Sequence, residues 1–475
     1  MTALPLSIGV IHFIGIGGIG MSGIAEILFE MGYSVQGSDS NESANVERLR
    51  KRGIEVMTPQ HPDNLREAAL TVISTAINDD NVELLEARRR FLPVVHRAEM
   101  LGELMRLRWS VAVAGTHGKT TTTSIVSTLL HAAGIDPTVI NGGVISSFGS
   151  NARLGSGDWM VVEADESDGS FSRLKPTVAI VTNIDPEHLD HHGSVEKLEA
   201  AFSAFVASVP FYGFASLCID HPAVQKLLPG ISDRRLITYG LSTNADVRAV
   251  NLSHNTRAMQ FDVQLSERLG LGDIQIDAVQ FPMLGEHNVL NCLAAISVGI
   301  EMGIDIPTIR MGLEQFRGVS RRFDVKGEVD GITIIDDYGH HPVEIKATLS
   351  AARMRCTSGR IIAIVQPHRY SRLHDLFEDF CACFNDADEV YVTDVFAAGE
   401  APIAGCEKDD LAAGLRAHGH RNANILETAD DLPEVINRAA GSGDLVVCLG
   451  AGTISKWAAA LPEQLEALKR RGGAA

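Results

Sequence analysis

Residues 114–123, AGTHGKTTTT, combine the side chains that bind the phosphates of a nucleotide. Glycines allow backbone N–H groups to approach phosphate, a lysine adds positive charge, and a hydroxyl binds Mg²⁺. The usual pattern G-x-x-x-x-G-K-[ST] requires a glycine at position 113, which here is valine. The groups that touch phosphate and magnesium all remain, so we predict a shortened ATP loop. Its residues are Gly115, Thr116, His117, Gly118, Lys119, Thr120 and Thr121.

Two acid-rich segments could complete this site, because each follows an apolar run that predicts a strand. They are VVEADESD (161–168) and NIDPEHLDHHG (183–193). Ligands bind beyond the carboxyl ends of parallel strands, so Thr120, Glu163 and His188 can converge there. Carboxylate and hydroxyl oxygens suit Mg²⁺, whereas histidine is an unusual ligand for so hard an ion. We predict a metal site of these three residues; for Glu163 and His188 taken singly, solvated loop residues are the alternative.

A second glycine loop, GIGGIG (15–20), lies between a predicted strand and a predicted helix, and Asp39 ends the next strand. Glycines and a helix N-terminus suit a diphosphate, and Asp39 could accept a hydrogen bond from a ribose hydroxyl. NAD or another nucleotide diphosphate would satisfy the pattern equally, and a turn without a ligand is the structural alternative. The predicted binding residues are Gly15, Gly17, Gly18, Gly20, Met21, Ser22 and Asp39.

Four further polar clusters occur at predicted strand ends or element boundaries. They are GEHNVLN (285–291), GVSRRFD (318–324), DDYGHHP (336–342) and QPHRYSR (366–372). Arg321 and Arg322 lie at a predicted domain boundary, where an arginine could stabilise charge on a transferring phosphoryl group. An interdomain salt bridge is the alternative for this pair.

The elements that must position these residues follow an alternation of short apolar runs and helical patterns, which is typical of α/β domains with parallel sheets. Three series of predicted strands begin near residues 10, 110 and 332, and residues 240–283 alternate as in an antiparallel meander. We predict three domains, at 1–106, 107–318 and 319–475. The first and last are Rossmann-like, and the central one is a P-loop ATPase-type α/β domain with the added meander.

Composition excludes several classes of protein. The net charge of −19 argues against a basic nucleic-acid-binding surface. Seven cysteines without a C-x-x-C pair favour a reducing compartment over a disulfide framework or zinc site. The apolar start lacks the basic region of a signal peptide, and no apolar run is long enough for a membrane span. We expect a cytoplasmic protein that neither binds nucleic acid nor inserts into a membrane.

Together the motifs resemble those of the Mur ligases of peptidoglycan synthesis. HFIGIGGIGMSGIAEIL, AGTHGKTTTT, EADESD, GEHNVLN, GVSRRFD, DDYGHHP and QPHRYSR occur in order and cover nearly the whole chain. The variants are most similar to those of members that add the first amino acid. The resemblance implies ATP-dependent ligation of L-alanine to the lactyl carboxylate of UDP-N-acetylmuramate through an acyl phosphate, giving ADP and phosphate. It also implies that the 15–20 loop holds the UDP diphosphate rather than NAD.

The resemblance assigns further residues. Asp39 would lie near the uridine ribose and His61 near the uracil. Thr120 and Glu163 would bind one Mg²⁺, and Glu163 with His188 a second. His287, Asn288 and Asn291 would meet the adenine, with Arg321 and Asp337 also on ATP, although Asp336 is the alternative to Asp337. Tyr338, His340, His368, Arg369 and Arg372 would surround L-alanine.

The catalytic set expected from these assignments is Lys119, Glu163, His188, Arg322 and His340. His340 or His368 could accept the proton of the alanine ammonium, by residue type alone. Several Mur ligases carry a carbamylated lysine in an EAAK context, but this chain has EAAF with Phe202. We therefore expect no modified lysine.

Three other functions are the alternatives. A ligase that attaches recycled tripeptide to the same sugar nucleotide belongs to the same family. An NAD-dependent oxidoreductase or a non-enzymatic nucleotide-binding regulator would each leave most of the polar clusters unexplained. Three substrates on three domains also imply domain closure, since water would hydrolyse an acyl phosphate.

Overall fold

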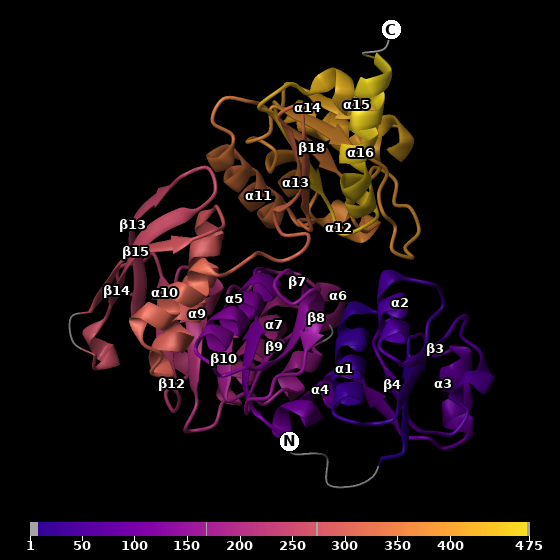
Figure 1. Ribbon diagram of the computed structural model, residues 1–475, viewed down its shortest axis with the longest axis vertical. Coiled ribbons are helices and arrows are strands. Elements are labelled where there is room, and N and C mark those ends of the chain that lie inside the picture. Colours follow the sequence, from indigo (N-terminus) through magenta and orange to yellow (C-terminus); the bar gives the residue numbers. More distant parts are fainter. Residues whose placement is uncertain (1–7, 168, 272–273, 473–475) are drawn as a thin grey trace. The chain divides into compact units, whose positions relative to one another are not determined.

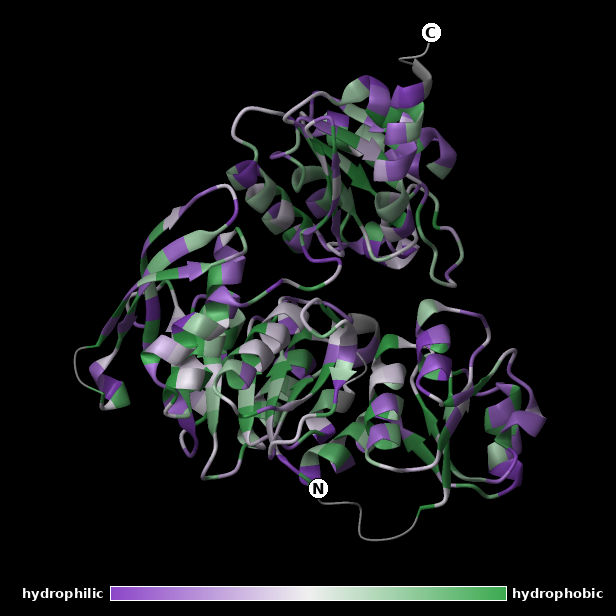
Figure 2. Cartoon of the chain, in the orientation of Figure 1, coloured by the Kyte–Doolittle hydropathy of each residue, from purple (hydrophilic) through white to green (hydrophobic). Residues whose placement is uncertain are grey.

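A computed structural model describes residues 8–167, 169–271 and 274–472. The chain is α/β throughout, with three sheets and their associated helices (Figure 1). Buried apolar side chains occupy the strands, and the polar residues gather on helices and loops (Figure 2). Among the helices described, none combines the length and the apolar character needed to span a bilayer.

The N-terminal sheet is parallel, with strand order β3-β2-β1-β4-β5. Its strands are β1 (Val10–Ile14), β2 (Val35–Ser38), β3 (Glu55–Met57), β4 (Ala68–Ile73) and β5 (Val94–His96). Its helices are α1 (Ile19–Glu30), α2 (Ala44–Lys51), the 3-10 turn η1 (Pro62–Leu65), α3 (Val82–Arg89) and α4 (Arg97–Arg106). The order reverses direction at β1, which in Rossmann-like sheets opens a ligand crevice at the carboxyl ends of the strands.

The central sheet has ten strands in the order β15-β14-β13-β12-β11-β10-β6-β9-β7-β8. They are β6 (Trp109–Ala114), β7 (Thr138–Ile145), β8 (Ser150–Arg153), β9 (Trp159–Glu163), β10 (Val178–Val181), β11 (Phe214–Cys218), β12 (Arg235–Gly240), β13 (Val247–His254), β14 (Met259–Leu265) and β15 (Gln275–Phe281). The connections between β13, β14 and β15 are too short for parallel crossovers, so these neighbours form the expected antiparallel meander.

The helices that accompany this sheet are α5 (Lys119–Ala132), α6 (Leu189–His192), α7 (Val195–Ala207), α8 (Pro222–Leu227), α9 (Glu286–Glu301) and α10 (Ile306–Glu314). The 3-10 turns are η2 (Ser170–Arg173), η3 (Leu228–Gly230) and η4 (Glu267–Leu269). Around the predicted ATP loop, β10, β6 and β9 are adjacent and parallel. Their carboxyl ends therefore lie at one edge of the sheet.

The C-terminal sheet has the order β16-β17-β21-β18-β19-β20 and is parallel except for the β16–β17 pair. Its strands are β16 (Asp324–Val329), β17 (Ile332–Asp337), β18 (Ile361–Val365), β19 (Glu389–Val392), β20 (Ala423–Ile425) and β21 (Leu445–Leu449). Its helices are α11 (Pro342–Arg355), α12 (Tyr370–Asp375), α13 (Phe377–Ala382), α14 (Lys408–Ala417), the 3-10 turn η5 (Ala429–Asp431), α15 (Leu432–Ala439) and α16 (Ile454–Gly472).

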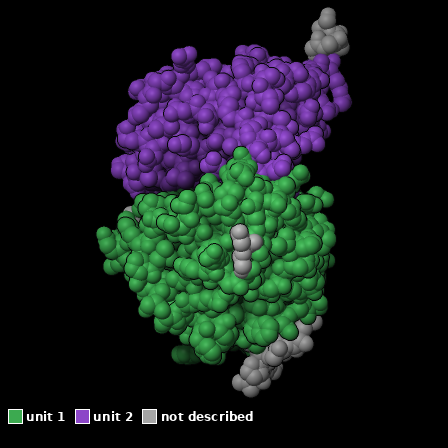
Figure 3. Space-filling model, turned by 90° about the vertical axis from the view of Figure 1, so that its left-hand side faces the viewer, with its two compact units in different colours: residues 1–252, 261–280, 289–317 green, residues 253–260, 281–288, 318–475 purple. Residues whose placement is uncertain are grey.

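The chain divides into two compact units, coloured separately in Figure 3. The first comprises residues 1–252, 261–280 and 289–317, and therefore holds both the N-terminal sheet and most of the central one. The second comprises residues 253–260, 281–288 and 318–475. The boundaries of the three domains that the sequence predicts, near residues 106 and 318, stay a prediction, because the chain divides here into two units.

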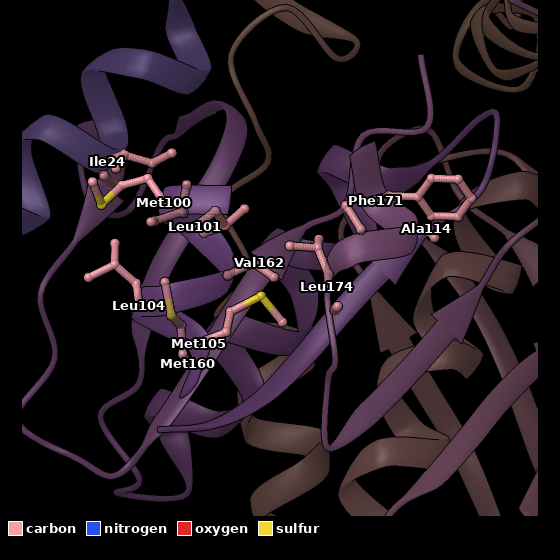
Figure 4. Packing of buried hydrophobic residues seen from close by; sticks show 14 of the residues in the cluster. Ile24, Met100, Leu101, Leu104, Met105, Ala114, Met160, Val162, Phe171 and Leu174 are labelled. Atoms are coloured by element: carbon pink, nitrogen blue, oxygen red, sulfur yellow. The ribbon is translucent and has the colours of Figure 1, made fainter. Parts of the chain in front are cut away.

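One continuous apolar core explains why the first unit holds two sheets. Helix α4 closes the N-terminal domain, yet its apolar side chains lie beside residues of β9 and of the segment after it (Figure 4). Members of this cluster that Figure 4 labels are Met100, Leu101, Leu104, Met105, Met160, Val162 and Leu174. Each is less than a tenth exposed, so α4 contributes to a core that crosses the predicted boundary near residue 106.

Candidate active site

The ATP loop predicted at 115–121 connects β6 to α5 through two glycines with positive φ. Gly115 has φ +133° and Gly118, which caps α5, has φ +83°. L-residues rarely adopt these angles, so both positions require glycine. A Cβ on Gly115 would overlap Thr182 Oγ1, and one on Gly118 would lie 2.6 Å from Asn291 Oδ1. The loop is thus held between the end of β10 and helix α9, and it begins α5 at Lys119.

The ammonium group of Lys119 donates to the carbonyl oxygens of Gly115 (2.7 Å) and Thr116 (3.0 Å) and to Glu166 Oε1 (2.9 Å). Burial alone would lower the lysine pKa, but the negative charges of Glu166, Asp165 and Glu163 overcome it and raise the pKa well above its ordinary value. Lys119 therefore stays positively charged, as a phosphate-binding lysine must.

Glu166 is 2% exposed, and its burial raises its pKa above the ordinary value although Lys119 opposes this. The imidazole of His192 lies 2.9 Å from the Glu166 carbonyl oxygen and helps to hold this segment. Asp165 forms an ion pair of 3.1 Å with Arg97, the first residue of α4. The acid-rich segment is thus tied both to the ATP loop and to the N-terminal domain.

The segment after β10 clamps the ATP loop from its other side. Asn183 accepts the His117 N–H through Oδ1 (2.7 Å) and donates to the His117 carbonyl oxygen (3.0 Å). The Asp185 N–H donates to Thr116 Oγ1 (2.8 Å), and its carboxylate lies 3.4 Å from His117 Nε2. Although burial opposes it, hydrogen bonds from His117 and His221 hold the pKa of Asp185 far below its ordinary value, so the clamp contains a fixed carboxylate.

The donors at this edge fit a magnesium ion that is bound partly by nucleotide phosphates. Thr120 lies in the first turn of α5 and Glu163 ends β9, where its carboxylate accepts the Gly142 N–H (2.7 Å). Across the described chain, no three His, Cys, Asp or Glu side chains are grouped as a complete metal site. Mg²⁺ uses one or two carboxylates plus phosphates and water, so Thr120 and Glu163 are a sufficient protein contribution.

His188 lies in the same loop as the clamp, with φ +57° and a side chain that is 26% exposed. Its Nε2 is 4.0 Å from Glu187 Oε2. Imidazole nitrogen suits Mg²⁺ less well than oxygen does, so the role of His188 as a ligand stays a prediction.

The N-terminal glycine loop is held mainly by Asp39 and the end of β2. Asp39 Oδ2 accepts the Gly17 N–H at 2.8 Å, and the Ser38 carbonyl oxygen accepts the N–H groups of Gly15 and Ile16. A Cβ on Gly17 would approach Asp39 Oδ2 to 2.8 Å, and one on Gly20 would overlap the Arg97 guanidinium. Only glycine fits at positions 17 and 20, and the loop leads directly into the N-terminus of α1, where we predict that a diphosphate binds.

Other residues predicted for this site differ in exposure. Met21 and Ser22 are buried, and the Ser22 hydroxyl donates to the Ile19 carbonyl oxygen (3.1 Å). The His61 side chain is 64% exposed, after the end of β3. Met21 and Ser22 can thus shape the helix start, whereas His61 is accessible to a ligand.

In the second unit, Tyr338 lies between two arginines. The guanidinium carbons of Arg321 and Arg322 lie 4.6 and 5.0 Å from the centre of its ring. Arg321 also donates to the Gly450 carbonyl oxygen (2.7 Å), while Arg322 lies 3.7 Å from Glu344. Two positive charges are therefore concentrated at the carboxyl end of β17.

The imidazole rings predicted to surround L-alanine are close together. The His340 ring lies 5.1 Å from Tyr338 and 5.8 Å from His368, and His368 stacks on Phe396. Arg372 Nη1 is 3.4 Å from His368 Nδ1. Burial, then the neighbouring His340 and arginines, lower the pKa of His368 to about 4, so its imidazole is neutral at neutral pH. A neutral imidazole can accept a proton.

Arg369 and Glu400 complete this region. Arg369 has φ +71° and precedes α12. Glu400 accepts the N–H (3.0 Å) and the hydroxyl (2.7 Å) of Ser371 and lies 3.9 Å from Arg369. Glu400 therefore fixes the start of the helix that carries Arg372.

Three residues predicted to meet the adenine, and Asp337, which is predicted to bind ATP, have different surroundings. Asn291 Oδ1 accepts the Thr122 hydroxyl (3.1 Å), so Asn291 contacts the helix of the ATP loop. Asn288 donates to the Leu284 carbonyl oxygen (2.8 Å). Burial and Arg322 lower the pKa of His287 to about 4. The Asp337 carboxylate accepts the N–H groups of Phe323 and Gly339 (both 2.7 Å) and the Thr348 hydroxyl, which fixes the arginine-bearing segment.

Sequence reasoning missed the residues that position the ATP loop. Asn183 and Asp185 belong to a cluster from which only His188 was chosen, and Thr182 directly precedes that cluster. Glu166 belongs to a cluster from which only Glu163 was chosen. The signal was the same in both cases: several polar side chains directly after a buried strand. Residue type alone does not tell a ligand from the side chain that holds the ligand-binding loop.

Three family models match consecutive parts of the chain. They are described as the Mur ligase family catalytic domain (residues 10–109), the Mur ligase middle domain (113–299) and the Mur ligase glutamate ligase domain (321–452). Together they cover most of the chain.

Curated relatives match over the full length. A UDP-N-acetylmuramate–L-alanine ligase of Rhodospirillum rubrum is 60% identical over 471 residues, 99% of this chain and 98% of the relative. One of Acidiphilium cryptum is 60% identical over 99% of both chains. Among solved structures, the UDP-N-acetylmuramate–alanine ligase of Thermotoga maritima has a TM-score of 0.82 and 30% identity, covering 96% of this chain and 99% of that one. A murein peptide ligase of Psychrobacter arcticus shares the fold, with a TM-score of 0.71 and 24% identity over 96% of this chain and 98% of that one.

Proposed function

The chain belongs to the Mur ligase family, and from that premise we propose that it joins L-alanine to the lactyl carboxylate of UDP-N-acetylmuramate at the expense of ATP. This would be the first peptide-adding step of peptidoglycan precursor synthesis. The observation that carries the proposal is a pair of glycine loops in one compact unit, each leading from a strand into a helix N-terminus. Each loop would bind the phosphates of one nucleotide substrate. Two full-length relatives of 60% identity, both named UDP-N-acetylmuramate–L-alanine ligase, support it.

The first step uses ATP to activate a poor electrophile. The lactyl carboxylate attacks the γ-phosphorus of ATP, the bond to the β,γ-bridging oxygen breaks, and an acyl phosphate and ADP form. The transferring group carries several negative charges near its attacking and leaving oxygens. Lys119 stays protonated because three carboxylates face it, so its ammonium can exchange Glu166 for phosphate oxygens without a change of charge. Each preorganised donor of this kind typically contributes roughly 3–4 kcal/mol to barrier lowering.

Mg²⁺ would be held by Thr120 and Glu163, with His188 as the further predicted ligand, and would neutralise phosphate charge. Two ions remain our proposal, as the resemblance implies. The hydrogen bond from Gly142 fixes the Glu163 carboxylate at the end of β9, and the carboxylate oxygens retain lone pairs that could bind a cation. The surplus of carboxylates at this edge favours a cation before a nucleotide arrives.

The second step joins the amine to the acyl carbon. The ammonium group of L-alanine loses one proton, and the resulting amine attacks the acyl carbon. The nitrogen of the tetrahedral intermediate loses a second proton, and phosphate leaves as the C–O bond breaks. In the second unit, neutral His368 and its neighbour His340 are the proton acceptors we propose. Arg322 would stabilise the phosphate oxygens, and the Tyr338 ring beneath its guanidinium would hold it in place beside L-alanine. Arg369 or Arg372 would pair with the alanine carboxylate.

Phosphate release tests the proposal. Purified protein is supplied with UDP-N-acetylmuramate, Mg-ATP and one amino acid or tripeptide at a time. We expect phosphate release that requires both the sugar nucleotide and L-alanine. Release that requires L-alanyl-γ-D-glutamyl-diaminopimelate instead would support the tripeptide-recycling ligase, and release independent of L-alanine would refute the proposal.

A further inference from the structure

A fully buried carboxylate lies beneath the exposed loop that carries His61. Glu83 in α3 is 0% exposed, and four donors reach its two oxygens. Oε2 accepts His12 Nε2 (3.0 Å) and the Ser38 hydroxyl (2.5 Å). Oε1 accepts the His61 N–H (3.0 Å) and the Asn64 side chain (2.8 Å). A buried charge is costly unless it is fully hydrogen-bonded, and this one is.

Further hydrogen bonds connect the residues around Glu83 to the loop at residues 60–65. The Gln36 amide donates to the carbonyl oxygens of Asn64 (3.1 Å) and Leu65 (3.3 Å) and toward His12 Nδ1 (3.1 Å). Because Nδ1 of His12 accepts a hydrogen bond, Nε2 carries the ring proton and donates a hydrogen bond to Glu83. Asn81, which caps α3, donates to Gln60 Oε1 (2.7 Å). Residues 60–65 are therefore held from β1, β2 and α3 at once.

The same network reaches the diphosphate loop through β2. Ser38 donates its hydroxyl to Glu83, and its carbonyl oxygen accepts the N–H groups of Gly15 and Ile16. Burial opposes ionisation of Glu83, but hydrogen bonds from His12, Ser38 and Asn64 dominate and lower its pKa. One ionised side chain thus joins the glycine loop at the end of β1 to the loop after β3.

The order of the strands indicates which part of a nucleotide would meet the loop after β3, which carries His61. The strands run β3-β2-β1, and neighbouring strands lie about 4.8 Å apart. A diphosphate on the glycine loop after β1 leaves the ribose beside Asp39 after β2, so the base extends over the loop after β3 (β3 and α3 are labelled in Figure 1). His61 on that loop is 64% exposed, and its Nδ1 accepts the Asp63 N–H (3.3 Å). Its other ring nitrogen, Nε2, can donate a hydrogen bond to a base or accept one from it, depending on the tautomer.

We propose that Glu83 is a positioning residue for nucleoside diphosphate binding, which holds His61 in place against the base and acts through that loop. The inference rests on the proposed function for the identity of the sugar nucleotide. It assigns Glu83 no contact with the ligand. Its role is to keep the loop in its binding conformation.

The test uses UDP as the probe and calorimetry on the full-length protein without ATP, so it needs no turnover. Glu83→Gln keeps the volume but replaces one acceptor oxygen by an NH₂ group that faces two donors. We expect UDP affinity to fall roughly tenfold to a hundredfold, because a charge-assisted contact is lost. Affinity for a non-hydrolysable ATP analogue should stay within about twofold. Glu86→Gln is the matched control: Glu86 lies on the same helix and pairs only with Arg89 and Arg90 in the contacts described.

A double variant separates positioning from general destabilisation. His61→Ala should weaken UDP binding by a similar factor, and Glu83→Gln with His61→Ala should bind no more weakly than the weaker single variant. Effects that multiply, or an unchanged UDP affinity in either single variant, would overturn the inference. If Glu83→Gln does not fold, Asn64→Ala removes one donor from Oε1 and should weaken UDP binding in the same direction without a large change in Tm. Unchanged UDP affinity in Asn64→Ala would then refute the inference. Alanine-dependent phosphate release by the unaltered protein tests the proposed function separately.

Discussion

Replacing Gly115 by alanine tests whether the shortened ATP loop depends on the backbone conformation at its first residue. Gly115 has φ +133°, and an added Cβ would overlap Thr182 Oγ1 and lie 3.1 Å from both N and O of Asn183. Thr182 is itself fixed, since its hydroxyl donates to the His117 carbonyl oxygen (2.6 Å). The neighbours that must shift therefore belong to the clamp on the loop.

The size of the effect follows from two terms. A left-handed backbone costs an L-residue about 1–2 kcal/mol, and overpacking in a filled site costs about 1–3 kcal/mol. The sum is about 2–5 kcal/mol, by which the substitution destabilises the binding conformation of the loop. At about 1.4 kcal/mol per tenfold, affinity for ATP should fall at least thirtyfold.

Calorimetry with a non-hydrolysable ATP analogue measures this loss. Gly134→Ala is the matched control, because Gly134 follows the other end of α5, has φ +73°, and has no atom within 4 Å of an added Cβ. It should lose about 1 kcal/mol of stability from backbone strain alone and bind the analogue as the unaltered protein does. An unchanged affinity in Gly115→Ala, or an equal loss in Gly134→Ala, would show that contact with Thr182 does not shape the site.

Three further outcomes are expected. Lys119→Ala should abolish alanine-dependent phosphate release while UDP affinity in calorimetry stays within about twofold, because within the described residues the lysine side chain bonds to the ATP loop and Glu166. A large loss of UDP affinity would contradict this. His287 and His368 have pKa values lowered to about 4, mainly by burial, so they take up protons on unfolding below pH 6.5. The free energy of unfolding should therefore fall as the pH drops from 6.5 toward 4. The double variant His287→Gln, His368→Gln should show a weaker pH dependence in urea unfolding. An unchanged pH dependence would show that these two histidines do not cause it. Arg48→Met should lower the free energy of unfolding by about 1–3 kcal/mol, because it removes hydrogen bonds from the guanidinium to buried Glu26 and to Asn151 of β8. An unchanged midpoint of urea unfolding would show that these hydrogen bonds contribute little to stability.

The strands were predictable because parallel strands covered on both faces are short apolar runs, as in Val178–Val181 and Leu445–Leu449. The meander was predictable because a half-exposed strand alternates, as Met259–Leu265 does. Both signals are local, since each depends only on which faces of one strand are covered.

The shared core of the first unit and the residues that position the loops were not predictable in this way. The apolar face of α4 shows that the helix packs against something, but its spacing does not say which sheet. Glu83 belongs to VELLEARR, an ordinary helical charge pattern, and only the tertiary structure buries it beneath the His61 loop. Asp185 gave a signal as one acid in a polar cluster, yet its function depends on contacts with Thr116 and His117 that are distant in sequence.

The continuous core around α4 has a consequence for synthesis on the ribosome. Helix α4 ends at Arg106, but the 3-10 turn η2 that it contacts begins only at Ser170. At about 5–20 residues per second, several seconds separate their emergence, during which Met100, Leu101, Leu104 and Met105 lack the part of their core that includes Phe171 and Leu174. The first hundred residues should therefore be a poor independent folding unit and a natural client of chaperones. A fragment cut at the predicted boundary should aggregate, while one extended through β10 should remain in solution.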